Sequence, residues 1–179
     1  MYKKGQSAME YLMTYGWAIL VIVIVLAILA FYLPKLTKAP ESCLFTKTDE
    51  FDCNEVKAAI YAETGSNNVR VAFNLQNRMK QSVKLTRILC TTAPLAEVKA
   101  SDAELISSLA VAANYTVPAG GSRQYTVSCK DKTGKQITSQ PNAEFKGLLV
   151  VWYNYENEVS APVERQSEAV LTGTVLQQK

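Results

Sequence analysis

Four cysteines are the residues of this 179-residue chain whose chemistry is the most readily predicted. Cys43, Cys53, Cys90 and Cys129 all follow one long hydrophobic segment, and an even number of cysteines in one compartment predicts two disulfides. Four cysteines allow three pairings. We favour Cys43 with Cys53, which enclose a short loop, and this leaves Cys90 with Cys129 to join two predicted strands. The other two pairings, and four reduced buried cysteines, remain alternatives.

Residues that could support catalysis or hold a metal are few. The chain has no histidine, which removes the most frequent general base, and it has no closely spaced cysteine pair of the kind that binds zinc. Asp49, Glu50 and Asp52 lack the spacing of a calcium-binding loop, and Gly120-Gly121 is typical of a hairpin tip rather than of a phosphate-binding loop. We therefore predict a non-enzymatic protein without catalytic residues, metal or cofactor.

One triplet, Asn114-Tyr115-Thr116, has the sequence of an N-glycosylation acceptor. Asn114 is a candidate for modification if this part of the chain is translocated. Such triplets are also common by chance.

The hydrophobic segment, residues 11–33, contains no charged residue. At about 1.5 Å rise per residue a helix of this length spans roughly 34 Å, enough to cross the hydrocarbon core of a bilayer. The apolar stretch of a cleaved secretory signal is far shorter, and no small-x-small cleavage site follows this one. We expect the segment to remain in the mature protein. Lys3 and Lys4 would then hold the amino terminus in the cytoplasm, although a plain single-pass anchor leaves Glu10 unexplained.

Charge is distributed unevenly along the chain. Residues 40–179 carry 15 Lys or Arg and 15 Asp or Glu, so the net charge of +3 comes from Lys3, Lys4, Lys35 and Lys38 against Glu10. A neutral head excludes general nucleic-acid binding, which requires a basic surface.

The amino terminus resembles a known leader. Lys4-Gly5-Gln6, followed by Ser7, Glu10, Leu12 and the apolar run, is similar to the class III signal peptide of archaeal type IV pilins, over roughly the first 35 residues. The resemblance implies that a membrane-embedded prepilin peptidase cuts between Gly5 and Gln6. It also implies that Glu10, then the fifth residue, neutralises the new α-amino group of a neighbouring subunit.

This arrangement is physically reasonable. Cutting after Gly5 removes Lys3 and Lys4 and leaves an ammonium group on Gln6 beside an apolar helix. An unpaired ammonium or carboxylate inside a helix bundle would cost several kcal/mol, whereas the Gln6 ammonium and the Glu10 carboxylate of a neighbour compensate each other.

The remainder of the chain has the patterns of short strands. Alternating apolar residues at 68–75 and 83–89 predict half-buried strands, 147–155 suits a central strand, and 169–176 suits the last strand. Residues 114–117 and 123–129 are expected to form a hairpin around 118–121. Residues 53–62 and 101–112 are predicted to be helical, the second because Ser101 and Glu104 have capping-box spacing, although a loop is an alternative there. Pro34 should kink or end the apolar helix.

We therefore expect an α+β protein with three parts: a basic leader (1–5), a transmembrane and polymerisation helix with its neck (6–38), and an extracytoplasmic head (39–179). Six or more short strands with turn signals between them favour a mainly antiparallel β-sandwich for this head, and the resemblance to archaeal pilins and archaellins implies an immunoglobulin-like one. The predicted function is that of a structural subunit of an adhesive pilus. Its partners would be copies of itself, the prepilin peptidase, the assembly machinery and, before assembly, the membrane. Alternatives are an archaellin, a minor pilin, a binding protein with a pilin-like leader, and an unprocessed single-pass binding module.

Overall fold

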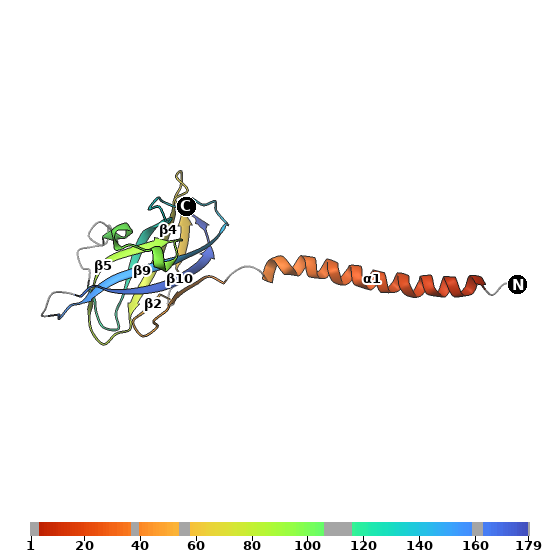
Figure 1. Cartoon of the computed structure of the whole chain (residues 1–179), viewed down its shortest axis with the longest axis horizontal. Coiled ribbons are helices and arrows are strands. Elements are labelled where there is room, and N and C mark those ends of the chain that lie inside the picture. The colour runs from red at the N-terminus through yellow and green to blue at the C-terminus, as the bar shows by residue number, and fades with distance from the viewer. Residues whose placement is uncertain (1–3, 37–39, 54–57, 106–115, 159–162, 179) are drawn as a thin grey trace. The chain divides into compact units, whose positions relative to one another are not determined.

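The computed structural model describes residues 4–36, 40–53, 58–105, 116–158 and 163–178, and along the helix it describes the side chains of residues 13 and 15–32. Its contacts divide the chain into two units, Met1–Lys38 and Ala39–Lys179. Figure 1 shows a helix followed by a head built almost entirely of strands. The predicted α+β class is confirmed in this form, a single helix and a curled sheet.

Helix α1 (Lys4–Leu36) has 33 residues and is therefore about 50 Å long. Pro34 does not end the helix at once, since two more helical residues follow it. Proline removes one backbone donor, and in the final turn only the last part of the hydrogen-bond ladder is affected. The helix therefore ends two residues after Pro34, where the sequence predicted a kink or an end.

The described part of the head contains eleven strands and two single-turn 3-10 helices. Their bounds are β1 Ser42–Phe45, β2 Phe51–Asp52, β3 Ala59–Ala62, β4 Val69–Asn77, β5 Val83–Thr91, η1 Leu95–Glu97, η2 Ala100–Asp102, β6 Glu104–Leu105, β7 Thr116–Val117, β8 Ser122–Lys130, β9 Glu144–Tyr155, β10 Arg165–Thr174 and β11 Leu176–Gln177.

The strands follow the order β1-β10-β9-β5-β8-β4-β3-β11, with β2 beside β4 and with β6 and β7 beside β5. We call β1, β10, β9, β5, β6 and β7 the β9 half, and β8, β4, β3, β11 and β2 the β4 half. The pairing of β5 with β8 joins the halves; it is parallel and has only two register pairs, Cys90 with Cys129 and Thr91 with Lys130. The sheet therefore curls about a narrow connection.

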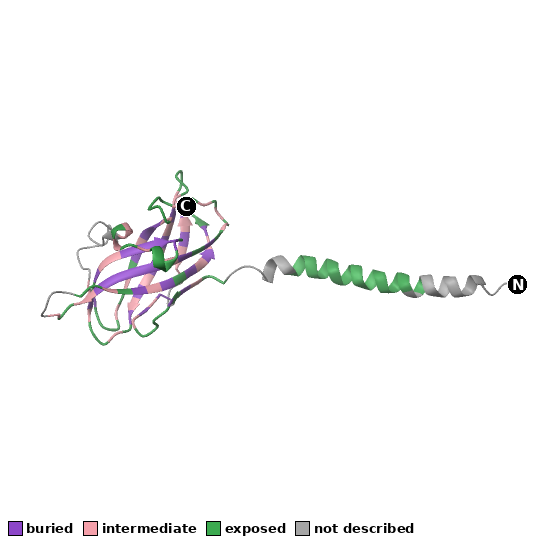
Figure 2. Ribbon diagram, in the orientation of Figure 1, coloured by how far each residue is buried: buried purple, intermediate pink, exposed green. Residues whose placement is uncertain are grey.

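The core lies inside this curl. Along β4, side chains alternate strictly between buried and half-buried, as the alternation in the sequence predicts. The largest fully buried side chains include Tyr125, Tyr153, Phe51 and Phe73, and Phe51 packs edge-on against Tyr153 with ring centroids 5.0 Å apart. Figure 2 shows the buried residues running along the strands of the head.

A second, smaller cluster lies on the outer face of the β9 half. Leu89, Val150 and Trp152 are buried there, and they pack against Val98 and Ala103 of the segment around η1 and η2. This covering explains why β9 is apolar on both faces, and it confirms β9 as an interior strand, between β10 and β5.

Three local predictions are wrong. Residues 59–62 form strand β3 rather than helix, and 104–105 form β6 rather than helix; the other parts of the two predicted helices that lie at 54–57 and 106–112 are outside the described residues. The strand 116–117 pairs with β5 and not with β8. β3 pairs with β4, the next strand, and β6 and β7 pair with β5; in each case strand pairing outweighs the local propensity, which is a weak determinant of structure.

Candidate functional site

Helix α1 exposes apolar side chains on all sides. Every described side chain between residues 13 and 32 is exposed, from 38% for Val21 to 81% for Phe31. The helix is long and apolar enough over Tyr15–Tyr32 to cross a membrane. A helix that is apolar all round requires lipid or other helices around it.

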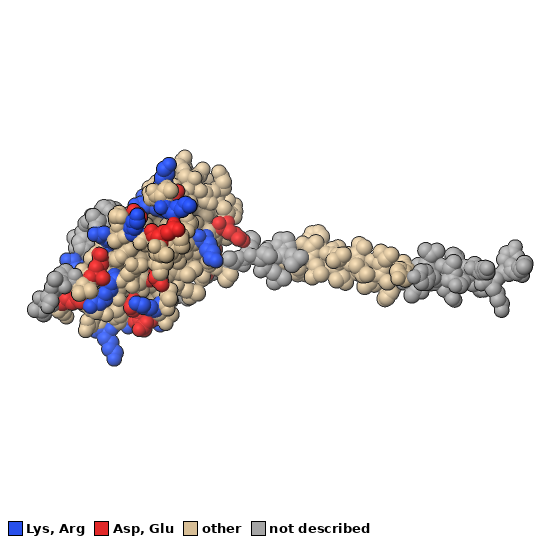
Figure 3. Space-filling model, in the orientation of Figure 1, with Lys and Arg blue, Asp and Glu red and all other residues tan. Residues whose placement is uncertain are grey.

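Charge sets the two units apart. Figure 3 shows acidic and basic side chains intermingled over the visible face of the head, whereas the described side chains of α1 carry no charge.

Within α1, a methyl group added at Gly16 would meet no atom within 4 Å. Nothing in the described part of this chain thus requires a glycine there, which leaves its small size available for close approach by another helix.

The residues predicted for processing and assembly lie at the start of this helix. Lys4, Gly5, Gln6 and Glu10 are all within α1, but their side chains, and the whole of Lys3, are outside the described residues. Gln6 and Glu10 are four residues apart, so their Cα atoms lie about one turn apart on the same side of the helix. The backbone is therefore compatible with their joint use in one contact. Asn114 also lies outside the described residues.

The four predicted cysteines form two disulfides. Cys43 is bonded to Cys53 and Cys90 to Cys129, which is the pairing favoured from the sequence. All four are at most 2% exposed. Each bond joins the two halves of the sheet: Cys43 lies in β1 and Cys53 directly follows β2, while Cys90 lies in β5 and Cys129 in β8. Among the described residues no group of histidine, cysteine or acidic side chains could hold a metal ion.

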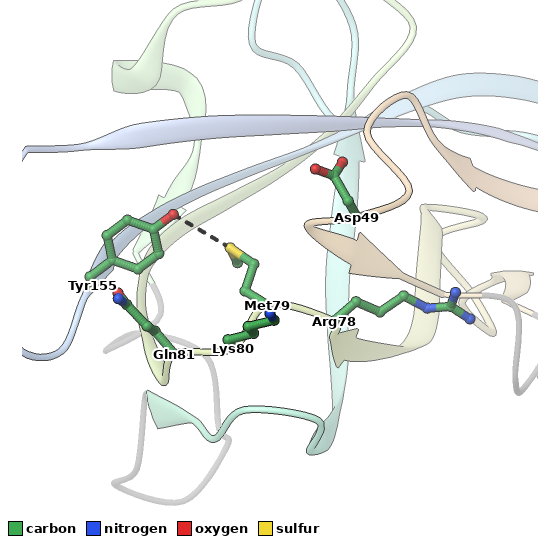
Figure 4. Close-up of a pocket in the computed structure, with 6 residues that line it drawn as sticks. All are labelled: Asp49, Arg78, Met79, Lys80, Gln81 and Tyr155. Atoms are coloured by element: carbon green, nitrogen blue, oxygen red, sulfur yellow. Dashed lines mark hydrogen bonds between the residues drawn. The ribbon is translucent and has the colours of Figure 1, made fainter.

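A surface pocket of about 440 Å³ lies at one end of the head. We call this the distal end, because the loops 46–50, 78–82 and 118–121 gather there, opposite the end at which the chain enters through Pro40. Figure 4 shows the lining residues, with Tyr155 and Met79 meeting on one side of the pocket and Arg78 turned away. The Tyr155 hydroxyl lies 3.8 Å from the Met79 sulfur, and Arg78 pairs with Asp52 at 2.5 Å.

Asn77 fixes the loops around this pocket. Its side chain is fully buried, and its amide nitrogen donates to the carbonyl oxygens of Gln81, Val117 and Pro118 at 2.8–3.2 Å. Its side-chain oxygen accepts a hydrogen bond from the backbone N–H of Met79 at 3.0 Å. One amide group thus holds two loops in place. The sequence analysis missed it, although a signal existed: a polar residue occupies the next inward position of a strictly alternating strand.

Two buried tyrosines remain protonated over the physiological pH range. Burial raises the pKa of Tyr125 to about 12. Burial and the neighbouring Glu50 carboxylate raise the pKa of Tyr153 further above its ordinary value. Neither hydroxyl can serve as a base at neutral pH, and the polar side chains of the distal pocket are mostly exposed. The described part of the head therefore presents a folded surface with a polar pocket.

Comparison with protein-family models gave no match to this chain, and comparison with curated proteins likewise gave none. The best-defined candidate for a functional element is helix α1, whose described side chains are uncharged and exposed. It is followed by a head that has two disulfides and a hydrophobic core of its own. Two disulfides and a helix of this kind indicate a membrane-anchored or extracellular protein.

Proposed function

We propose that this chain is a type IV pilin-like structural subunit, with a role in surface adhesion rather than in catalysis. The observation that carries the proposal is the exposure of α1 on all sides. The described side chains of the helix are uncharged and exposed, whereas the head has a hydrophobic core of its own. Lipid would cover it in the precursor, and helices of other copies would cover it in a filament.

The proposed processing follows from the leader sequence. Prepilin peptidase cuts between Gly5 and Gln6, and the helix loses the positive charges of Lys3 and Lys4 that oppose its withdrawal from the cytoplasmic face. The precursor spans the membrane once, with the amino terminus in the cytoplasm and the head outside. There the disulfides form, and Asn114 is accessible for glycosylation.

The first test is the amino-terminal residue of the mature protein, purified from its native host and identified by intact mass and by mass spectrometry of its terminal peptide. We expect a start at Gln6. A start at Met1 or Tyr2 would rule out prepilin-type processing and would leave an anchored protein.

Assembly is proposed to depend on the Gln6 ammonium and the Glu10 carboxylate of a neighbouring subunit, because each charge is costly alone within a helix bundle. Glu10→Ala should leave the protein in the membrane fraction and abolish filaments, as judged by electron microscopy. Glu10→Asp, which keeps the charge, is the matched variant and should retain part of the assembly. Filaments in normal number from Glu10→Ala would contradict the proposed pairing.

For the head we propose a two-layer β-sandwich, with the β9 half packed on the β4 half. The narrow β5–β8 connection and the single shared core support this proposal. Such a head would form the outer surface of the filament and make its contacts with other surfaces.

A second candidate, an unprocessed anchored binding module, is favoured by the distal pocket. Its loop 78–82 is held by Asn77, and the side chains of Asp49, Lys80 and Gln81 have no hydrogen-bond or ion-pair partner within the described residues. The two candidates are separated by the amino-terminal residue and by the Glu10→Ala phenotype.

A further inference from the structure

The point at which the chain enters the head is tightly fastened. The Thr172 hydroxyl donates a hydrogen bond to the carbonyl oxygen of Pro40 at 2.8 Å, and the Ser42 and Thr172 hydroxyls lie 2.8 Å apart. Two residues after Pro40, strand β1 begins, and it pairs antiparallel with β10 over four register positions. The first residues of the head are therefore attached directly to the β9 half.

Tension between this entry point and the distal end is directed along the strands. Under such a load the hydrogen bonds of the β1–β10 ladder stretch together, rather than opening one at a time from an end. The ladder has four register pairs, and one further bond, from the N–H of Thr46 to the carbonyl oxygen of Glu168, extends it. Hydrogen bonds alone provide only this short attachment.

The Cys43–Cys53 disulfide adds a covalent attachment at the same place. Cys43 is the second residue of β1, and Cys53 directly follows β2, which pairs with β4 through Phe51–Asn77 and Asp52–Gln76. A load on Pro40 thus reaches the β4 half through a covalent bond, as well as the β9 half through the β1–β10 ladder.

We propose a load-bearing function for this disulfide: it transmits tension from the neck into both halves of the head and confines extension to the residues before Cys43. The proposal rests on the proposed function in one respect: tension on the head arises only if the chain is anchored through its helix. Residues 44–52 are shielded from the load, because the covalent path from Pro40 to the distal end passes directly from Cys43 to Cys53.

The Cys90–Cys129 disulfide provides a matched control. It also joins the two halves and is fully buried, but it lies outside the covalent path from Pro40 to Lys80 at the distal pocket. Its loop of 39 residues exceeds the 10 of Cys43–Cys53, so its removal should lower the free energy of unfolding more. Comparing variants that lack one or the other bond therefore distinguishes an effect on resistance to tension from an effect on the free energy of unfolding.

The test is single-molecule force spectroscopy on the full chain in detergent micelles. One handle is an amino-terminal tag, and the other is an azide-bearing amino acid replacing Lys80, whose side chain is exposed. At a constant force that detaches β1 from β10 and β2 from β4 and so exposes the buried bond, a phosphine reductant should produce a discrete lengthening of about 30 Å, since ten residues at about 3.6 Å each are released and 5.7 Å is already spanned by the bond.

Cys90→Ser/Cys129→Ser should show the same step. Cys43→Ser/Cys53→Ser should show none, and its β1 should detach at a lower force; if this variant does not fold, the step in the native chain still tests the proposal. A native chain without the step, or a step that persists in Cys43→Ser/Cys53→Ser, would overturn it. Because the step is independent of processing and assembly, it can be observed even if the amino-terminal analysis refutes the pilin-like function.

Discussion

At the scale of single residues, the head depends on a few polar side chains placed where the strand pattern calls for apolar ones. Asn77 is the clearest example, since it lies inward at the end of β4 and satisfies three carbonyl groups and one N–H. Hydrogen bonding explains why a polar side chain is buried here, because a buried polar group is costly only when it lacks a partner.

Asn77→Ala should lower the free energy of unfolding by about 2–3 kcal/mol, because it leaves buried carbonyl groups without a donor. Chemical denaturation of the purified protein measures this. Asn74→Ala, on the outward side of the same strand, is the control and should change stability by less than about 0.5 kcal/mol. Equal effects of the two substitutions would show that Asn77 has no special role.

Tyr125 presents the opposite situation, a buried hydroxyl without a partner among the described residues. Burial raises its pKa to about 12, so the folded state disfavours the ionised form. The stability associated with the neutral hydroxyl is complete below the unfolded pKa of about 10 and is lost as the pH rises toward 12.

Tyr125→Phe should therefore keep or slightly raise stability at pH 7 and should make unfolding less sensitive to pH between 10 and 12. Denaturation midpoints across that range provide the measurement, with Tyr61→Phe on β3, where the ring is half-exposed, as the control. An unchanged alkaline profile for Tyr125→Phe would mean that other groups govern it.

At the scale of elements, the sequence predicts best where one face of a strand is buried. Alternation correctly located β4 and β5, and the continuous apolar run correctly located β9. It failed for β3 and β6, which were predicted to be helical, and it gave β7 the wrong partner strand; these strands are two to four residues long and depend on pairing with β4 or β5. Short segments carry too few residues for a period to be recognised, and the partner strand cannot be found from local pattern.

The β5–β9 pair contains a close backbone approach. A methyl group added at Gly147 would lie 2.8 Å from the Thr91 carbonyl oxygen and 2.9 Å from the Phe145 ring. Gly147→Ala should therefore force β9 away from β5 and cost about 1–3 kcal/mol in thermal or chemical unfolding. Gly173→Ala is the matched control, since the nearest atom there is a terminal methyl of Ile60 at 3.1 Å, which can move. A larger loss for Gly173→Ala would contradict this explanation.

At the scale of the whole molecule, the change of composition along the sequence predicts the division of the chain into helix and head, and the observed disulfide pairing is the one that the sequence favoured among three possible pairings. What the sequence did not predict is that both bonds join the two halves of the sheet, because strand order depends on contacts between distant segments. The candidate sites differ in the same way: the helix was predictable from composition, whereas the distal pocket depends on the positions of two separate loops and of the end of β9.

Loss of the Cys90–Cys129 bond should lower the free energy of unfolding by about 4 kcal/mol, and loss of Cys43–Cys53 by about 3 kcal/mol, since the longer loop gains more entropy in the unfolded chain. Denaturant unfolding of the two double serine variants tests this order. A reversed order would indicate that native contacts around Cys43, rather than loop closure, dominate the effect.

The pairing of β1 with β10 also constrains when the head can fold. Ser42 meets Thr172, a residue 130 positions later, so β1 cannot pair with β10, its partner among the described strands, until residues 165–174 have been made. If the helix inserts before the head is translocated, β1 emerges without its partner strand, although Cys53, the disulfide partner of Cys43, follows only ten residues later. Completion of the carboxyl-terminal strands is then the event that closes the head, and a chain truncated before β10 would remain open to degradation and aggregation.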